Sequence, residues 1–412
     1  MRRERRLNGR DLVHYGTPTL SLRSSGVVPR KPLIVFSLAA VVLAAVASAA
    51  ADAAPRRSAQ QLFPGVTYER QVQFTRRGPV VLHVITAPRP TGAYSLEPVL
   101  SNGVVSGRER LTAIQRRLAG TAAVAGVNGD FFYADGRPSG ILMQDGVLNS
   151  FPYPGRSSLG IDAHGNLRVA TVGVVPTWNG RGQRRPLGGL NRPPSANGVT
   201  LFTPAWGQAT PAMAGSVEAV IGAFPPTVPN VELAGPITAL RQGGGTPIPA
   251  GGAVLAARGN GARFLTAEAP VGTQLGARIV LPADWGAVDA IGGGPVLVRG
   301  GRAVFRAREA FAPLFLATRQ ARTAVAQRAD GRIVLVAVDA GRLGASTGLS
   351  NFELAQALVR LGAVTGYALA GGSSTVMAGN GRLLSRPSGR RGEPALADAL
   401  MLLYRSARAA RA

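Results

Sequence analysis

The sequence contains no cysteine, and beyond its first 53 residues it has only two histidines, His83 and His164. The absence of cysteine excludes disulfides, a thiolate nucleophile and a cysteine-based zinc site. His83 falls within a strand pattern and His164 within a turn, so we expect both to be structural. A histidine-based triad or a multi-histidine metal site is therefore not expected. No metal-loop spacing occurs either, and we predict no metal and no cofactor.

Lysine is also scarce: Lys31 is the only one among the 46 basic residues, and the formal net charge is +25. A charge of this size is compatible with nucleic-acid binding. The folded part, however, shows no recognition helix, aromatic stacking motif or basic block, so we expect no nucleic-acid partner. A sugar-phosphate or acidic envelope glycan is one interpretation of the charge, and a solvated basic surface is the other.

Residues 1–53 read as a basic leader followed by a signal peptide or an anchor. The uncharged run Leu33–Val46 follows a basic pair and precedes small residues with two A-x-A cleavage patterns. This run is short for a membrane span of roughly 20 residues. Cleavage would give a secreted or cell-envelope protein, whereas without cleavage residues 33–51 would associate with the membrane. The leader is long for a signal peptide, so a later start of translation is a further interpretation.

The remaining sequence predicts one large domain with many turns. Its 54 glycines and 30 prolines are unfavourable for long helices and indicate a β-rich body. We expect a linker and first strand at 54–78, the main domain at 79–404 and a short tail at 405–412. Within the main domain, residues 164–290 are poor in charge and rich in turns, which predicts a lateral β-rich insertion.

The C-terminal quarter predicts a strand, a helix and a second strand. Ile333–Val338 is an apolar run of strand length, and Gly366–Ala370 is the second strand. Between them, Ser350 and Glu353 form a capping-box pattern, and Gly362 ends the helix. Such a unit normally has parallel strands and a right-handed crossover. We therefore predict an α+β fold with a mixed sheet and a βαβ unit near the C-terminus.

This unit would bring two polar segments to one sheet edge. Asp339 follows the first strand, and Gly371, Gly372, Ser373 and Ser374 follow the second. Ligands usually bind at the carboxyl ends of strands in α/β sheets. The loop could bind an anion through its backbone N–H groups, although such strings are also common in ordinary loops. Asp339 could equally serve only to form its turn.

Several of these segments together resemble the phosphodiester glycosidase family, which includes the N-acetylglucosamine-1-phosphodiester alpha-N-acetylglucosaminidases. Its bacterial members are often labelled exopolysaccharide-biosynthesis proteins. The likeness covers roughly residues 79–404. The matching segments are Asn128–Phe132, Gly292–Leu297, Arg322–Thr323, Val338–Arg342, Gly348–Leu354, Ala368–Thr375 and Ser385–Ser388. The resemblance implies a hydrolase that acts on a sugar phosphodiester or a cell-envelope glycan.

Glycosidic cleavage generally needs a carboxylic acid and a carboxylate, and Asp130 and Asp339 are the candidates. Asp130 follows a buried strand and precedes two phenylalanines that could wall a sugar site. Its alternative role is a hydrogen bond within its own turn. Asn128 and Gly129 would contact the sugar or phosphate, although Asn128 could also simply adopt a left-handed turn conformation.

Arginine could hold the phosphate through its planar fork. Arg322, directly before a strand, and Arg386 are the candidates, and with so many arginines a structural role is the alternative for both. Together with Gly371–Ser374, they would bind the substrate.

One position departs from the family pattern. Its members typically carry an acidic residue before the two glycines of the corner, and here that residue is Ala370. If that carboxylate is catalytic, activity is impaired or lost. The sequence therefore supports two functions, an exported phosphodiester glycosidase that uses carboxylate chemistry, or a non-catalytic protein that binds envelope glycans or assembles the wall.

Overall fold

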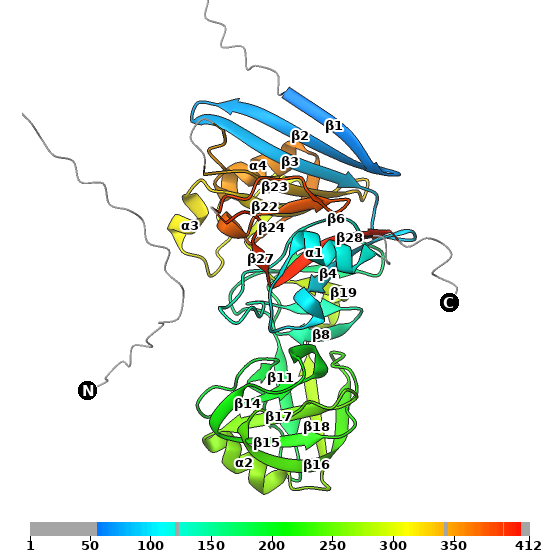
Figure 1. Ribbon diagram of the computed structural model, residues 1–412, viewed down its shortest axis with the longest axis vertical. Coiled ribbons are helices and arrows are strands. Elements are labelled where there is room, and N and C mark those ends of the chain that lie inside the picture. Colours follow the sequence, from blue (N-terminus) through cyan, green and yellow to red (C-terminus); the bar gives the residue numbers. More distant parts are fainter. Residues whose placement is uncertain (1–55, 120–122, 342–344, 390, 405–412) are drawn as a thin grey trace, which may run out of the picture. The chain divides into compact units, whose positions relative to one another are not determined.

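The structure is a computed structural model, and the residues that it describes belong to one compact unit (Figure 1). The described residues are 56–404, except for 120–122, 342–344 and 390. The predicted leader and tail, 1–53 and 405–412, lie outside them.

The main sheet has eight strands, and every neighbouring pair is antiparallel. In spatial order they are β1 (Arg56–Phe63), β2 (Val66–Thr75), β3 (Gly78–Ala87), β23 (Ile333–Val338), β22 (Arg322–Arg328), β24 (Ala363–Leu369), β20 (Val296–Arg299) and β21 (Arg302–Ala303). β-Branched residues are frequent in β3 and β23 and suit a buried pleated surface.

Both faces of the main sheet are covered. One face carries alternate residues such as Ile85, Val325 and Leu335 and packs against a second sheet of five strands. The other face packs against α4 (Asn351–Arg360) through Leu354 and Leu358. The strands of the second sheet are β26 (Arg382–Leu383), β25 (Met377–Gly379), β6 (Ala123–Asn128), β28 (Asp398–Tyr404) and β4 (Tyr94–Leu100). This arrangement buries the sheet on two sides.

A third sheet and a two-stranded pair accompany these sheets. The third sheet comprises β10 (Leu167–Ala170), β9 (Ser158–Asp162), β19 (Ala287–Ile291), β7 (Leu142–Gln144) and β8 (Val147–Ser150). The pair is β5 (Glu109–Arg110) with β27 (Ala395–Leu396). The short helices are α1 (Leu111–Arg117) and α3 (Pro313–Ala317), and the 3-10 turns include η5 (Gly372–Ser374).

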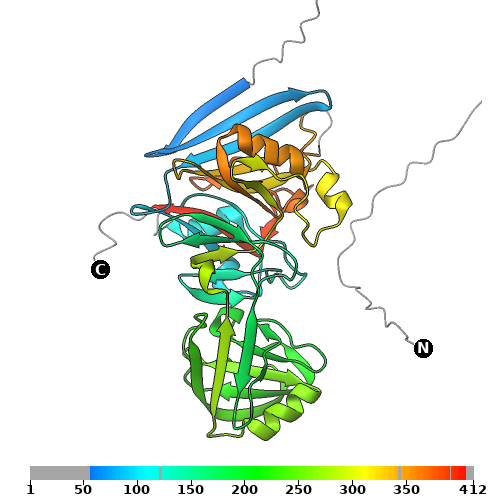
Figure 2. The same cartoon turned by 180° about the vertical axis from the view of Figure 1, so that it is seen from behind.

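Residues 175–280 supply all eight strands of a fourth sheet. The same stretch includes α2 (Asn260–Glu268), which packs beside this sheet (Figure 2). Its strands in spatial order are β12 (Arg185–Pro186), β11 (Val175–Asn179), β18 (Gln274–Val280), β16 (Glu232–Gly244), β15 (Ala212–Ile221), β17 (Ala253–Arg258), β14 (Val199–Phe202) and β13 (Gly189–Leu190). The core of this sheet contains Trp178 and Leu255, which are fully buried.

The predicted α+β class and its βαβ unit are wrong, because the chain is predominantly β. The strand–helix–strand segment exists, but β23 and β24 are not hydrogen-bonded neighbours. β22, which comes earlier in the chain, lies between them and pairs antiparallel with both. Since both strands oppose β22, they run in the same direction and end at the edge where Arg322 begins β22. Asp339 and the loop after β24 therefore start from one sheet edge, by a different topology from the one predicted.

Candidate functional site

A cavity of about 540 Å³ opens at this edge of the main sheet. It lies against β2 and β3, the turn after β23 and the segment 384–387. Its charged or ionisable members are Arg70, His83, Asp339 and Arg386. The rest of its lining comprises Val72, Phe74, Pro79, Val81, Ala340, Ala345, Ser346, Leu384, Ser385 and Pro387. A pocket of this size accommodates a sugar-sized ligand.

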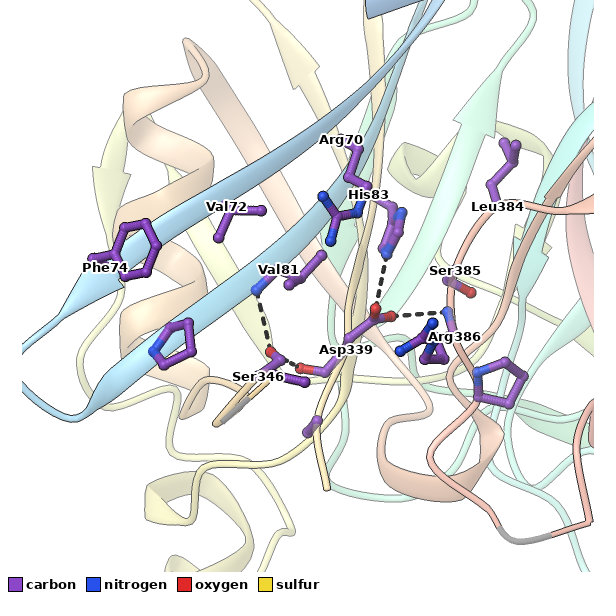
Figure 3. Close-up of a pocket in the computed structure, with 14 residues that line it drawn as sticks. Arg70, Val72, Phe74, Val81, His83, Asp339, Ser346, Leu384, Ser385 and Arg386 are labelled. Carbon is purple, nitrogen blue, oxygen red and sulfur yellow. Dashed lines mark hydrogen bonds and ion pairs between the residues drawn. The ribbon is translucent and has the colours of Figure 1, made fainter. Parts of the chain in front are cut away.

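Asp339 lies at the centre of the polar side chains in this cavity. Its Oδ2 is 3.0 Å from His83 Nε2, and its Oδ1 accepts a 2.9 Å hydrogen bond from the backbone N–H of Arg386. The Asp339 side chain is 13% exposed, so it still reaches the cavity. Figure 3 shows the side chains of Arg70, His83 and Arg386 converging on this carboxylate. Asp339 is thus held in one orientation by the His83 ring and the backbone N–H of Arg386.

His83 connects Asp339 to Tyr68. Burial raises the pKa of the Tyr68 phenol, which therefore keeps its proton. The Tyr68 hydroxyl is 2.8 Å from His83 Nδ1. If it donates to Nδ1, the hydrogen of a neutral imidazole is on Nε2 and is donated to Asp339. The Tyr68–His83–Asp339 chain fixes the imidazole and the carboxylate together.

The other predicted site residues do not line this cavity, but they gather around Ala370. Asn128 Nδ2 donates a 2.7 Å hydrogen bond to the Ala370 carbonyl, and the Ala370 N–H donates to the Gly129 carbonyl at 2.9 Å. Asn128 Oδ1 accepts from Thr323 Oγ1 and from the Val376 N–H. Asn128 is buried, and its amide is used to hold the corner of the chain together.

Asp130 is buried beside this corner. Its carboxylate accepts hydrogen bonds from the N–H groups of Phe131 and Gly140, at 2.7 and 2.6 Å, and from Ser139 Oγ at 3.2 Å. Burial raises the pKa of Asp130 to about 6, and these hydrogen bonds oppose the rise. The carboxylate is therefore directed at the backbone N–H of Phe131 and at the segment of Ser139 and Gly140.

Asp398, at the start of β28, is a second buried carboxyl group and was missed in the sequence. Its Oδ1 accepts a 2.6 Å hydrogen bond from the Asp130 N–H, and its Oδ2 has no partner among the described residues. Burial raises its pKa well above the usual range, and the charge of Asp130 adds to the effect. A Cβ on Gly129 would lie 1.9 Å from Asp398 Oδ1, so this position requires glycine. The one sequence signal was an acid at the start of a strand whose next residues are apolar.

Three phenylalanines form a cluster next to Asp130. The Phe131 ring lies 5.8 Å from the rings of Phe311 and Phe315, which stack on each other at 5.7 Å. The guanidinium of Arg156 lies 4.3 Å from the Phe311 ring centroid, a cation–π contact. Phe131 thus packs mainly against other aromatic rings, and all three rings are half-buried.

Arg322 is 2% exposed and forms no ion pair with an acidic residue in the described part of the chain. Its Nε donates to the Leu349 carbonyl, and its Nη2 donates to the carbonyls of Phe315 and Thr318, at 2.7–3.0 Å. Burial lowers the pKa of the guanidinium to about 10. The Phe315 ring centroid lies 5.0 Å from its Cζ. The predicted site residues therefore divide into a cavity group, Asp339 and Arg386, and a corner group around Ala370.

Within the described parts of the chain, no three histidine or acidic side chains come together as a metal site. No helix among the same residues is long and apolar enough to cross a membrane.

Residues 228–403 match the family model of the phosphodiester glycosidases. This confirms the resemblance seen in the sequence for the part that contains Arg322, Asp339, Gly371–Ser374 and Arg386. The segment around Asp130 precedes the matched range. No curated protein matches the chain.

Solved structures support the fold. A hypothetical protein from Synechocystis matches with a TM-score of 0.70 and 27% identity, over 86% of this chain and 64% of the Synechocystis chain. This chain therefore spans less than two thirds of that protein. A candidate exported protein from Burkholderia pseudomallei K96243 has a TM-score of 0.64 and 24% identity, with coverages of 79% and 74%. The catalytic domain of zebrafish N-acetylglucosamine-1-phosphodiester alpha-N-acetylglucosaminidase, auto-inhibited by its pro-peptide, has a TM-score of 0.47 and 15% identity, with coverages of 85% and 88%, and supports no argument at that score.

Proposed function

We propose that this protein, whose residues 228–403 match the phosphodiester glycosidases, hydrolyses a sugar phosphodiester of the cell envelope in the Asp339 cavity. The observation that carries the proposal is the position of one oriented carboxylate between Arg70 and Arg386 in a cavity of about 540 Å³. Guanidinium groups bind phosphate oxygens through paired hydrogen bonds. The cavity thus offers a base or nucleophile beside a place for an anion.

In this proposal Asp339 alone carries the carboxylate chemistry. As a base it takes a proton from water, whose oxygen forms a bond to the anomeric carbon while the bond from that carbon to the phosphate oxygen breaks. The electron pair of the broken bond stays on the phosphate, and the products are the free sugar and a phosphate monoester. Asp130 lies outside the cavity, and we propose that it holds the turn beside Ala370.

A single carboxylate is sufficient for this substrate class. Glycosidases usually protonate the leaving oxygen with a second carboxylic acid. A phosphate monoester is a weakly basic leaving group, so it departs as an anion and gains little from a general acid. The reaction therefore tolerates Ala370, and simple alkyl glycosides should be poor substrates.

The second candidate function is a non-catalytic protein that binds an envelope glycan. Two observations favour it: Ala370 supplies no carboxylate, and among the described residues that line the cavity Asp339 is the only acidic one. The same arginines would then bind the anionic glycan without cleavage.

Export is part of the proposal. The A-x-A patterns after the apolar run of the leader support it, and the match to a candidate exported protein concerns the fold alone. The protein would then be secreted or remain in the cell envelope.

The test is hydrolysis of an activated sugar phosphodiester by the purified protein and by Asp339→Asn. We expect the variant to lose about 10²- to 10⁴-fold in rate, the usual effect of removing a positioned acid or base. Asp330→Asn is the matched control, because the Asp330 side chain is 54% exposed and pairs only with Arg332. Equal rates for the wild type and Asp339→Asn would refute the mechanism. Glycan binding without cleavage by either protein would establish the second function.

A further inference from the structure

The β2–β3 hairpin carries a row of cross-strand pairs on the face that meets the second sheet. Tyr68 and Ile85 form one such pair, and both belong to the core between the two sheets. Side chains alternate along a strand, so every second pair along the hairpin points to this same side. The three pairs that follow toward the hairpin turn line the cavity instead of the core: Arg70 with His83, Val72 with Val81, and Phe74 with Pro79.

The chemical character of this row changes along its length. The pair nearest the core is polar, and its His83 contacts Asp339. The two outer pairs are apolar. Figure 3 shows Arg70, Val72 and Phe74 in this order along β2, with Phe74 farthest from Asp339. Since the first and last pairs are four residues apart, the row is about 13 Å long. The cavity is thus charged at one end and apolar at the other.

The apolar end is open to solvent. Phe74 is 55% exposed, and Val72 and Pro79 are half-buried. Val81 is buried, and its carbonyl accepts a 3.0 Å hydrogen bond from the Asp339 N–H, so the apolar surface begins beside the catalytic candidate. Apolar surface in contact with water is unfavourable, and an apolar ligand that covers it gains free energy. The hydroxyls of a sugar would not provide this gain.

We propose that the cavity takes a phosphodiester whose second alcohol is apolar, an alkyl or prenyl chain that lies along the Val72–Val81 and Phe74–Pro79 pairs. That the other ester is a sugar rests on the proposed function. Arg70 precedes Val72 on the same face of β2, so a phosphate held by Arg70 has the apolar row beside it. The sugar then lies at the Asp339 end, and hydrolysis leaves the apolar alcohol on the phosphate monoester. The substrate class is therefore a lipid-linked sugar.

The test compares the binding of hexyl phosphate and methyl phosphate to the purified protein by calorimetry. Both resemble the monoester product and contain no glycosidic bond, so binding is measured without turnover. Hexyl phosphate should bind about tenfold or more tightly than methyl phosphate, because a fully buried methylene adds about fourfold and the hairpin covers one side of the chain. Arg70→Gln should weaken both ligands, because it removes a phosphate contact.

Variants of Phe74 assign the preference to the hairpin. Phe74→Ser should remove most of the preference for hexyl phosphate and leave the affinity for methyl phosphate unchanged. Phe74→Leu keeps an apolar side chain and should keep the preference, which separates lost apolar contact from a disturbed hairpin. Leu314→Ser is the matched control, because Leu314 is 76% exposed on α3 and does not line the cavity.

Equal affinity of the wild type for the two phosphates would overturn the inference, as would a preference that persists in Phe74→Ser. The outcome is separate from that of the catalytic test. A preference for hexyl phosphate with equal hydrolysis rates for the wild type and Asp339→Asn would support the ligand class and refute the mechanism. Hydrolysis that depends on Asp339 without any preference for hexyl phosphate would refute only the apolar alcohol.

Discussion

Asp130 and Asp398 are buried carboxyl groups with raised pKa values, so the free energy of unfolding should depend on pH. The pKa of Asp130 rises from 3.8 to about 6 on folding, because burial disfavours the charged carboxylate. An acid with a raised pKa holds its proton more tightly in the folded protein. Below pH 3.8 Asp130 is protonated in both states and does not change the free energy of unfolding. This free energy falls as pH rises from 3.8 to about 6, and above pH 6 the decrease stays constant. With about 1.36 kcal/mol for each pH unit, Asp130 destabilises the folded state by about 3 kcal/mol at neutral pH.

Asp130→Asn removes this titration. The free energy of unfolding of the wild type minus that of the variant should therefore fall by about 3 kcal/mol between about pH 3.5 and 7. The loss of the Asp130 charge also removes a cause of the raised pKa of Asp398, which acts in the same direction. The amide accepts fewer hydrogen bonds from Ser139 and Gly140, but that cost is nearly the same at every pH.

Urea unfolding at a series of pH values, followed by tryptophan fluorescence, measures this difference. The reporters are Trp178, Trp206 and Trp285, all of which are buried. Asp330→Asn, on the surface, should keep the pH dependence of the wild type. If the free energy of unfolding of the wild type minus that of Asp130→Asn stays constant or grows with pH, burial does not raise the pKa of Asp130.

Two further predictions concern the termini of the helix and of the chain. Ser350→Ala should lower the free energy of unfolding by about 1 kcal/mol, because the Ser350 hydroxyl accepts a hydrogen bond from the Glu353 N–H in a complete capping box. Ser373→Ala, at an exposed position, is the control. Equal effects of the two substitutions in urea unfolding would contradict the capping role. N-terminal sequencing of protein from the native host should find a mature end near Ala50 or Ala54, whereas an intact leader in the membrane fraction would support the anchor instead.

Local features were readable from the sequence because they depend on near neighbours. Ile333–Val338 was predicted as a strand and is β23, and Ser350 with Glu353 forms the predicted capping box. Gly362 ends the helix with a φ of 85°, as a left-handed cap requires. Such interactions span only a few residues, so composition and spacing are enough to indicate them. The segments around Asp339 and Gly371 were located for the same reason.

The tertiary structure decided which of these segments meet. The sequence could not indicate that β22 lies between β23 and β24, because strand order is set by the burial of both faces of the main sheet and not by local preference. His83 was interpreted as structural, yet it contacts Asp339, 256 residues away, and joins it in the cavity. Asp398 reaches the Asp130 turn across 268 residues. The sequence by itself determined the strands, the caps and the family likeness. The tertiary structure divided the predicted residues between the cavity and the Ala370 corner. Only the pairing of distant strands could do this, because the register of a strand decides which side each of its side chains faces.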